Sequence, residues 1–136
     1  RIIPGITAGI GGTAYAGIPL THRDINSSVT FIAGRGSAGE LPERHNWEAI
    51  AKGSPVIVMY MATKYIHEIV DLLIIHGRLP DEPVAVITQA CLPEQMVYET
   101  KLSKCGSTYS TSQFADTINQ VMKLASPYTV AAPARP

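Results

Sequence analysis

The residues best suited to polar chemistry are His22, Arg23 and Asp24, which stand together after a long stretch without charge. Residues 4–21 before them are crowded with glycine and alanine, and such small side chains let a backbone approach another surface closely. We therefore expect this stretch to be buried or to lie under a ligand, and the charged cluster to border a binding site. A structural salt bridge between Arg23 and an acid is the alternative that the residues leave open.

The same stretch contains Gly9-Ile10-Gly11-Gly12-Thr13-Ala14, which matches the dinucleotide-binding pattern GxGxxG/A. That chemistry requires a strand immediately before the glycines, so that the start of the next helix meets a pyrophosphate. Only three residues precede the Pro4-Gly5 break, which is too few for a strand. Close packing of a helix therefore explains the glycines better than a nucleotide cradle in an oxidoreductase.

The remaining ionisable residues do not form a recognisable catalytic or metal-binding pattern. His67 and His76 lie nine positions apart on one predicted helix, which places them on nearly opposite faces. With no His-x-x-x-His spacing we expect no metal site, and we place His45, His67 and His76 on the solvated surface. Cys91 has no assignable histidine partner, so we expect a buried free thiol. A Ser-His-Asp triad, paired catalytic carboxylates and a Walker loop are not visible.

Met61 and Ala90 follow two apolar segments, residues 55–61 and 83–88, that are typical of strands covered on both faces. In parallel α/β sheets ligands bind outside the carboxyl ends of the strands. The positions therefore suit a binding site, although core packing would also explain the methionine.

The elements that must position these residues alternate in type along the chain. Periodicity and turn residues predict helices at residues 7–16, 47–51, 63–77 and 114–125, with Thr7 as an N-cap and Gly77 ending the third helix. Strands are predicted at residues 28–33, 55–61, 83–88, 95–102 and 128–132, the fourth of them antiparallel, and residues 106–112 read as a polar loop. The fold class is therefore α/β, with a mixed parallel and antiparallel sheet flanked by helices.

Composition excludes several classes of protein. With 136 residues, 46% of them apolar and 16% charged, the chain fits one globular domain. Eleven basic residues balance eleven acidic ones, so a nucleic-acid partner is not expected. Two cysteines suggest a reducing, cytoplasmic setting, and no apolar run approaches the ~18 residues of a membrane span. Because the chain begins at Arg1 without methionine, it looks like a piece of something longer.

Four strings occur in order along the chain: PGIT, AGIPLTHRD, SVTF and VIVMYM. Together they resemble the tetrapyrrole methyltransferases, from Ile2 to about Leu102 and weakly on to Ala132. The resemblance covers only the C-terminal half of that family, since the GxGPGD and GGDP motifs of its N-terminal domain are absent. It implies an interdomain segment with a small-residue helix at residues 1–25, a C-terminal α/β domain at 26–132 and a tail at 133–136.

The resemblance also implies an activity. The family's two-domain enzymes of this type hold S-adenosylmethionine between their halves and methylate two pyrrole carbons of uroporphyrinogen III. The product is precorrin-2, which leads to sirohaem or cobalamin. Such enzymes are typically cytoplasmic homodimers without a metal, and the isolated half is expected to be inactive. A non-catalytic dimerisation or binding module and a different precorrin methyltransferase are the alternatives.

The family's cofactor contacts in this half correspond to Thr7, Ala8, Met61 and Ala90. The substrate carries carboxylate arms, which pair well with guanidinium and ammonium groups. His22 and Arg23 are therefore the candidate substrate contacts. No catalytic residue is assigned.

Overall fold

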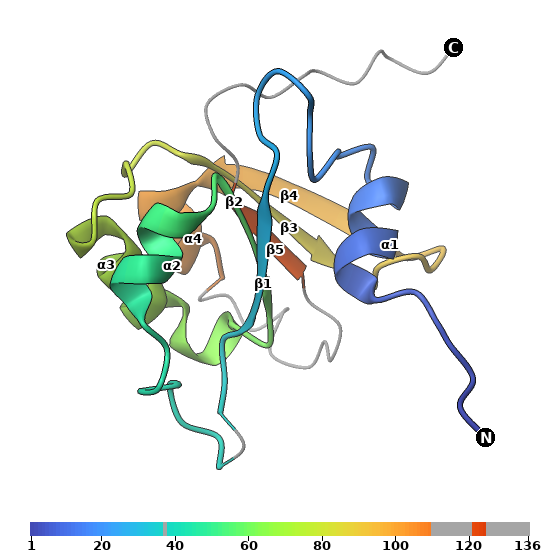
Figure 1. Ribbon diagram of the computed structural model, residues 1–136, viewed down its shortest axis with the longest axis horizontal. Coiled ribbons are helices and arrows are strands. Elements are labelled where there is room, and N and C mark those ends of the chain that lie inside the picture. The colour runs from blue at the N-terminus through green and yellow to red at the C-terminus, as the bar shows by residue number, and fades with distance from the viewer. Residues whose placement is uncertain (37, 110–120, 125–136) are drawn as a thin grey trace.

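A computed structural model describes residues 1–36, 38–109 and 121–124 of the chain (Figure 1). Its centre is a five-stranded sheet in the order β1-β2-β5-β3-β4. The strands are β1 (Val29–Ala33), β2 (Val56–Tyr60), β3 (Pro83–Thr88), β4 (Met96–Lys101) and β5 (Val121–Leu124). The helices are α1 (Ala8–Tyr15), α2 (Trp47–Gly53), the 3₁₀ helix η1 (Thr63–Tyr65), α3 (Ile66–Ile75) and α4 (Leu102–Tyr109).

The sheet is mixed, as the sequence predicts. β1 pairs in parallel with β2, whereas β5 is antiparallel to both β2 and β3, and β4 is antiparallel to β3. Strands β1, β2 and β3 therefore run in the same direction, and their carboxyl ends share one edge of the sheet. This is the edge where α/β sheets place their ligands.

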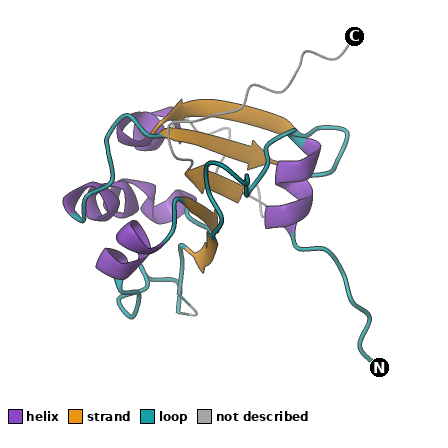
Figure 2. Ribbon diagram, turned by 45° about the horizontal axis from the view of Figure 1, so that its top comes forward, coloured by secondary structure: helices purple, strands orange, loops and turns teal. Residues whose placement is uncertain are grey.

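Helices cover the two faces of the sheet unequally. Of the helices in the described residues, α2, α3 and α4 lie on one face and α1 lies on the other (Figures 1 and 2). Because successive strand residues point to opposite faces, Ile57 and Met59 join the larger core, and Val56 and Val58 pack on the α1 side. This division explains why the β2 segment is apolar throughout.

The larger core is built as the helical period predicts. Ile66, Ile69, Val70 and Leu73 of α3 are buried, and the helix is followed by Gly77 at φ 105°, a left-handed conformation that glycine adopts freely. None of the helices in the described part of the chain is long and apolar enough to cross a membrane.

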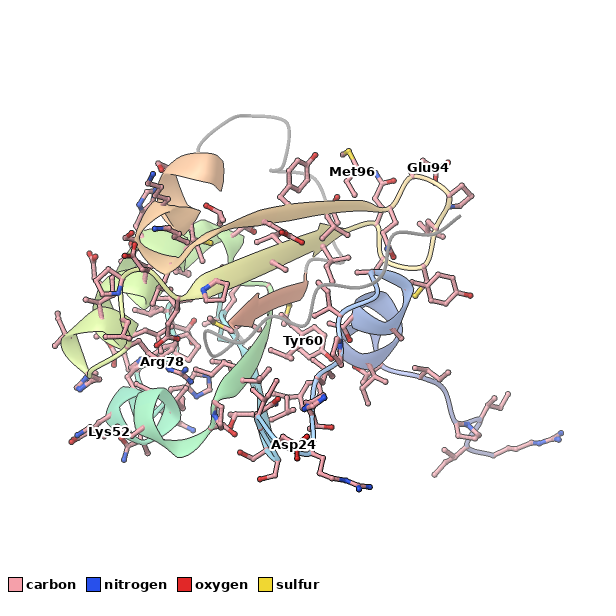
Figure 3. All side chains as sticks on the ribbon, turned by 90° about the horizontal axis from the view of Figure 1, so that it is seen from above. Asp24, Lys52, Tyr60, Arg78, Glu94 and Met96 are labelled. Carbon is pink, nitrogen blue, oxygen red and sulfur yellow. The ribbon has the colours of Figure 1, made fainter. Side chains whose placement is uncertain are left out.

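A buried ion pair ties α3 to the sheet. Arg78 donates from Nη1 to Glu82 Oε2 at 3.0 Å and to the Pro55 carbonyl at 3.2 Å, and from Nη2 to the Ser54 carbonyl. Glu82 in turn accepts from the Leu79 amide at 3.0 Å. The pair therefore fixes the turn after α3 to the start of β2, well away from the carboxyl ends of the strands (Figure 3).

Two predictions for the last third of the chain are wrong. The polar loop predicted at residues 106–112 is occupied up to Tyr109 by α4, which Leu102 and Cys105 anchor through buried contacts. Within the helix predicted at residues 114–125, Val121–Leu124 is a strand, because hydrogen bonding to both β2 and β3 there overrides helix propensity. The other residues of that predicted helix lie outside the described residues. The strand predicted at residues 128–132 lies outside the described residues.

Candidate functional site

Helix α1 packs closely against the strand ends because it contains glycines. A Cβ atom at Gly9 would collide with the Tyr60 hydroxyl and would lie 2.9 Å from both Phe31 Cε1 and Val58 Cγ1. A Cβ atom at Gly12 would lie 2.7 Å from the Cβ of Ala90. Residues 1–7 form no strand, so close packing is confirmed as the reason for the glycines and the dinucleotide-cradle alternative is wrong.

The start of α1 is capped from outside the helix. Thr7 occupies the N-cap position as predicted, but its side chain does not bond to a helix amide. The Tyr60 hydroxyl accepts from the Gly9 amide at 3.0 Å and lies 2.5 Å from Thr7 Oγ1. Tyr60, which lies between the sheet and α1 in Figure 3, thus connects the end of β2 to the start of the helix.

The two strand ends beside α1 carry unusual backbone conformations. Met61 after β2 has φ 56°, and Gln89 and Cys91 after β3 have φ 49° and 67°. Residues with a side chain rarely adopt such angles, which cost about 1–3 kcal/mol each and cluster at ligand sites. The strain therefore marks the carboxyl ends of β2 and β3 as candidate binding positions.

The four candidate cofactor residues come to this one region. Ala8, Ala90 and Tyr60 pack against the same apolar cluster of Val56, Val58 and Ile87. Thr7 contacts Tyr60, whose chain neighbour Met61 is half exposed. Residues distant in sequence thus form a small, uncharged surface that carries the hydroxyls of Thr7 and Tyr60.

The His22 cluster is a short turn closed by a backbone bridge, and within the described part of the chain it lacks the salt bridge that the sequence left open as an alternative. His22 and Asn26 form an isolated antiparallel bridge, with the His22 amide donating to the Asn26 carbonyl at 2.9 Å. Arg23 and Asp24 are exposed in the turn between them, and Arg23 has no salt bridge to any acid that the structure describes. The Arg23 side chain is thus exposed to solvent, and among the described residues no hydrogen bond or ion pair joins this turn to Met61 or Ala90.

Three predictions about burial need correction. Cys91 is exposed instead of buried, because its left-handed backbone turns out of the sheet with the amide held by Gln95 Oε1 at 2.7 Å. His45 and His76 are half-buried, whereas His67 is exposed as predicted, and His45 Nε2 lies 2.9 Å from the Ala33 carbonyl oxygen. The glycine-rich stretch is buried only where one face of α1 meets the sheet, namely at Gly9, Gly12 and Thr13.

Tyr60 is a site residue that sequence reasoning missed. The sequence predicts it only as part of an apolar strand, although a half-buried tyrosine requires a partner for its hydroxyl. That requirement is the signal in the sequence that points to Tyr60.

Among the residues that the structure describes, no group of three or more histidine, cysteine or acidic side chains could hold a metal ion.

Comparisons with known proteins agree on one family. The family model of the tetrapyrrole (corrin/porphyrin) methylases matches residues 1–105. A uroporphyrinogen-III C-methyltransferase of Sinorhizobium is 61% identical over 104 residues, covering 76% of this chain and 37% of that protein. One from Synechocystis is 50% identical over 95 residues, covering 70% and 36%. The chain therefore spans about a third of the length of these curated relatives.

A solved structure gives the same fold. The uroporphyrin-III C-methyltransferase of Thermus thermophilus, complexed with S-adenosylhomocysteine, superposes with a TM-score of 0.75 at 22% identity. The match covers 92% of this chain and 52% of that one. The predicted fold class, one half of a tetrapyrrole methylase, is confirmed.

Proposed function

The chain belongs to the tetrapyrrole (corrin/porphyrin) methylases, and from this membership we propose that it forms the C-terminal half of a uroporphyrinogen-III C-methyltransferase. The proposed enzyme uses S-adenosylmethionine to convert uroporphyrinogen III to precorrin-2, on the way to sirohaem or cobalamin. The observation that carries the proposal is the 61% identity with the Sinorhizobium enzyme of that name. Residues 1–25 would join the two halves, and residues 26–132 would form the C-terminal domain.

Thr7, Ala8, Met61 and Ala90 are the proposed cofactor contacts. Ala8 and Ala90 offer small side chains against which an adenine ring can lie, and Thr7 adds a hydroxyl for a hydrogen bond. When bound, S-adenosylmethionine supplies a methyl group already activated by its sulfonium, so the surrounding residues mainly orient the reactants. The strained Met61 backbone supports this placement, because such strain persists where a surface is held in one preorganised shape.

His22 and Arg23 are the proposed contacts to the carboxylate arms of the substrate. Arg23 is exposed in a turn that the bridge between His22 and Asn26 holds together. A guanidinium presented in this way can bind a carboxylate through two parallel hydrogen bonds. Substrate and cofactor would thus contact separate parts of the chain.

The proposed enzyme is a cytoplasmic homodimer. Both cysteines of this chain are free thiols, which suits a reducing compartment. Ile10 within α1 and Ile6 just before the helix expose large apolar side chains, and such surface is commonly covered by another part of the protein or by a second copy. Light scattering of the active protein would give its mass directly.

Joining the chain to a complementary half tests the function. We expect a fusion of the chain to the N-terminal part of the Sinorhizobium relative to methylate uroporphyrinogen III twice, and the chain alone to be inactive. Mass spectrometry of the products with labelled methyl donor measures both. A fusion that folds and binds the donor but methylates only a later precorrin would identify a different precorrin methyltransferase. A folded fusion that binds no donor would favour a non-catalytic module.

A matched pair of variants examines the cofactor surface. Ala90→Leu should weaken binding of S-adenosylhomocysteine to the fusion by about tenfold or more, since one overpacked side chain can cost about 1–3 kcal/mol. Ala49→Leu is the control, because Ala49 is exposed on α2 across the sheet from α1. Equal affinities in the two variants would remove Ala90 from the proposed site.

A further inference from the structure

Tyr60 stands between the proposed cofactor contact Thr7 and the body of the fold. Its ring is held by stacking on Phe31, with centroids 6.4 Å apart and planes 18° apart, and by packing against the cluster of Val56, Val58 and Ile87. Its hydroxyl therefore occupies a fixed position at the end of β2. Gly9 makes this position possible, because any Cβ there would overlap the hydroxyl.

The hydroxyl joins two groups at the start of α1. The Gly9 amide donates to Tyr60 Oη at 3.0 Å, and Thr7 Oγ1 lies 2.5 Å from the same oxygen. Either oxygen can donate across the shorter contact. A phenol is a stronger acid than an aliphatic alcohol and is the better donor, and the hydrogen bond that it accepts from Gly9 strengthens its own donation.

Donation by Tyr60 determines what Thr7 can do. An N-cap threonine ordinarily accepts from an amide of its own helix, but Thr7 makes no such bond because Tyr60 has taken that role at Gly9. With its oxygen accepting from Tyr60, the exposed Thr7 hydroxyl keeps its proton for another acceptor. Among the described residues no such acceptor lies within hydrogen-bond distance of Thr7.

We propose that Tyr60 is a positioning residue that turns the Thr7 hydroxyl into an oriented hydrogen-bond donor for an acceptor atom of the bound nucleoside. The donors run in one direction, from the Gly9 amide to the Tyr60 hydroxyl, then to the Thr7 hydroxyl and then to the ligand. Tyr60 acts only through Thr7 and does not touch the reacting atoms. The inference rests on the proposed function, because it takes the ligand to be an adenosyl nucleoside.

Affinity and kinetics of the fusion protein test the proposal. Tyr60→Phe keeps the ring but removes the hydroxyl, and Thr7→Val keeps the shape but removes the donor. Each should raise the Kd for S-adenosylhomocysteine and the KM for S-adenosylmethionine about five- to tenfold, as expected for one lost hydrogen bond, with kcat changing less. The double variant should bind about as weakly as either single variant, and Thr7→Ser should bind like the wild type.

Tyr98→Phe is the matched control, because Tyr98 is another strand tyrosine and its hydroxyl lies 3.1 Å from Met96 Sδ on β4. It should leave both constants unchanged. A second readout needs no ligand: exchange of the Gly9 amide hydrogen should be faster in Tyr60→Phe than in the wild type and unchanged in Tyr98→Phe.

The outcomes separate the inference from the function. Equal affinity of wild type and Tyr60→Phe, or effects of Tyr60→Phe and Thr7→Val that simply add, would overturn the positioning role and leave the function standing. Unchanged exchange at Gly9 would also overturn it. A wild-type fusion that binds no S-adenosylhomocysteine would remove the proposed function, and the inference with it.

Discussion

Arg23 carries the proposed recognition of the substrate at the level of a single residue. Arg23→Ala should raise the KM of the fusion for uroporphyrinogen III about 10- to 100-fold, because a charge-assisted hydrogen bond to a carboxylate is lost. The KM for S-adenosylmethionine should stay unchanged, since the proposed cofactor contacts lie on other elements. Arg44→Ala is the control, because Arg44 is also exposed in a loop. Unchanged substrate KM in Arg23→Ala would exclude this residue from binding.

The two cysteines should differ sharply in reactivity. Burial raises the pKa of the Cys105 thiol from its ordinary value near 9 to about 12, whereas Cys91 is exposed. Since the thiolate is the nucleophile, a disulfide reagent at pH 8 should modify one thiol per native chain and two after denaturation. In Cys91→Ser the native chain should not react. Rapid modification of two thiols in the native wild type would contradict this burial.

The same shift gives a dependence of stability on pH. Cys105 stays protonated in the folded chain up to about pH 12, whereas the unfolded thiol loses its proton near pH 9. The contribution of this group is therefore complete below pH 9 and is lost as the pH rises from 9 towards 12. The loss should be smaller in Cys105→Ala, as urea unfolding of the two proteins at pH 7 and pH 10 would measure.

Helix α1 and the strands beneath it form the element that shapes the site. Gly12→Ala should lower the free energy of unfolding by about 1–2 kcal/mol, because overpacking against Ala90 outweighs the gain in helix propensity. Gly53→Ala is the control at the end of α2, where an added Cβ has no atom within 4 Å, and it should raise stability by about 0.5–1 kcal/mol. Urea titration measures both, and a stabilising Gly12→Ala would show that α1 is not tightly docked.

Helices and strands whose own residues show a clear apolar or periodic pattern could be predicted from the sequence. Those that form only by pairing with distant strands could not. The apolar β2 and the periodic α3 lie where their own residues indicate. In contrast, β5 is a strand because it pairs with β2 on one side and β3 on the other, and nothing in its own four residues specifies those partners. The same holds within the site. The places of Met61 and Ala90 could be predicted, because each follows an apolar strand in the sequence. The contact of Thr7 with Tyr60 could not, because it joins residues 53 positions apart.

The whole molecule exposes apolar side chains where the two halves of the enzyme are proposed to meet. We define the α1 patch as Ile6, Ile10 and Leu92, which are at least half exposed. These residues lie near one another around Gly11, the chain neighbour of Ile10. A Cβ atom at Gly11 would lie 3.6 Å from Ile6 and 3.2 Å from Cys91, the chain neighbour of Leu92. An apolar patch of this kind on one side of a sheet is typical of a surface that another domain covers.

This patch should bind a hydrophobic dye in the isolated chain and lose that binding in the fusion. Ile10→Lys should lower the fluorescence of bound dye in the isolated chain, because it replaces an apolar side chain of the patch by a charged one. Ile75→Lys is the control: Ile75 is 75% exposed but lies on α3, across the sheet from the patch. Fusion to the N-terminal part of the Sinorhizobium relative should lower the wild-type signal and abolish the difference that Ile10→Lys makes. If the fusion binds as much dye as the isolated chain, the N-terminal half does not cover α1, and the proposed cleft between the halves must lie elsewhere.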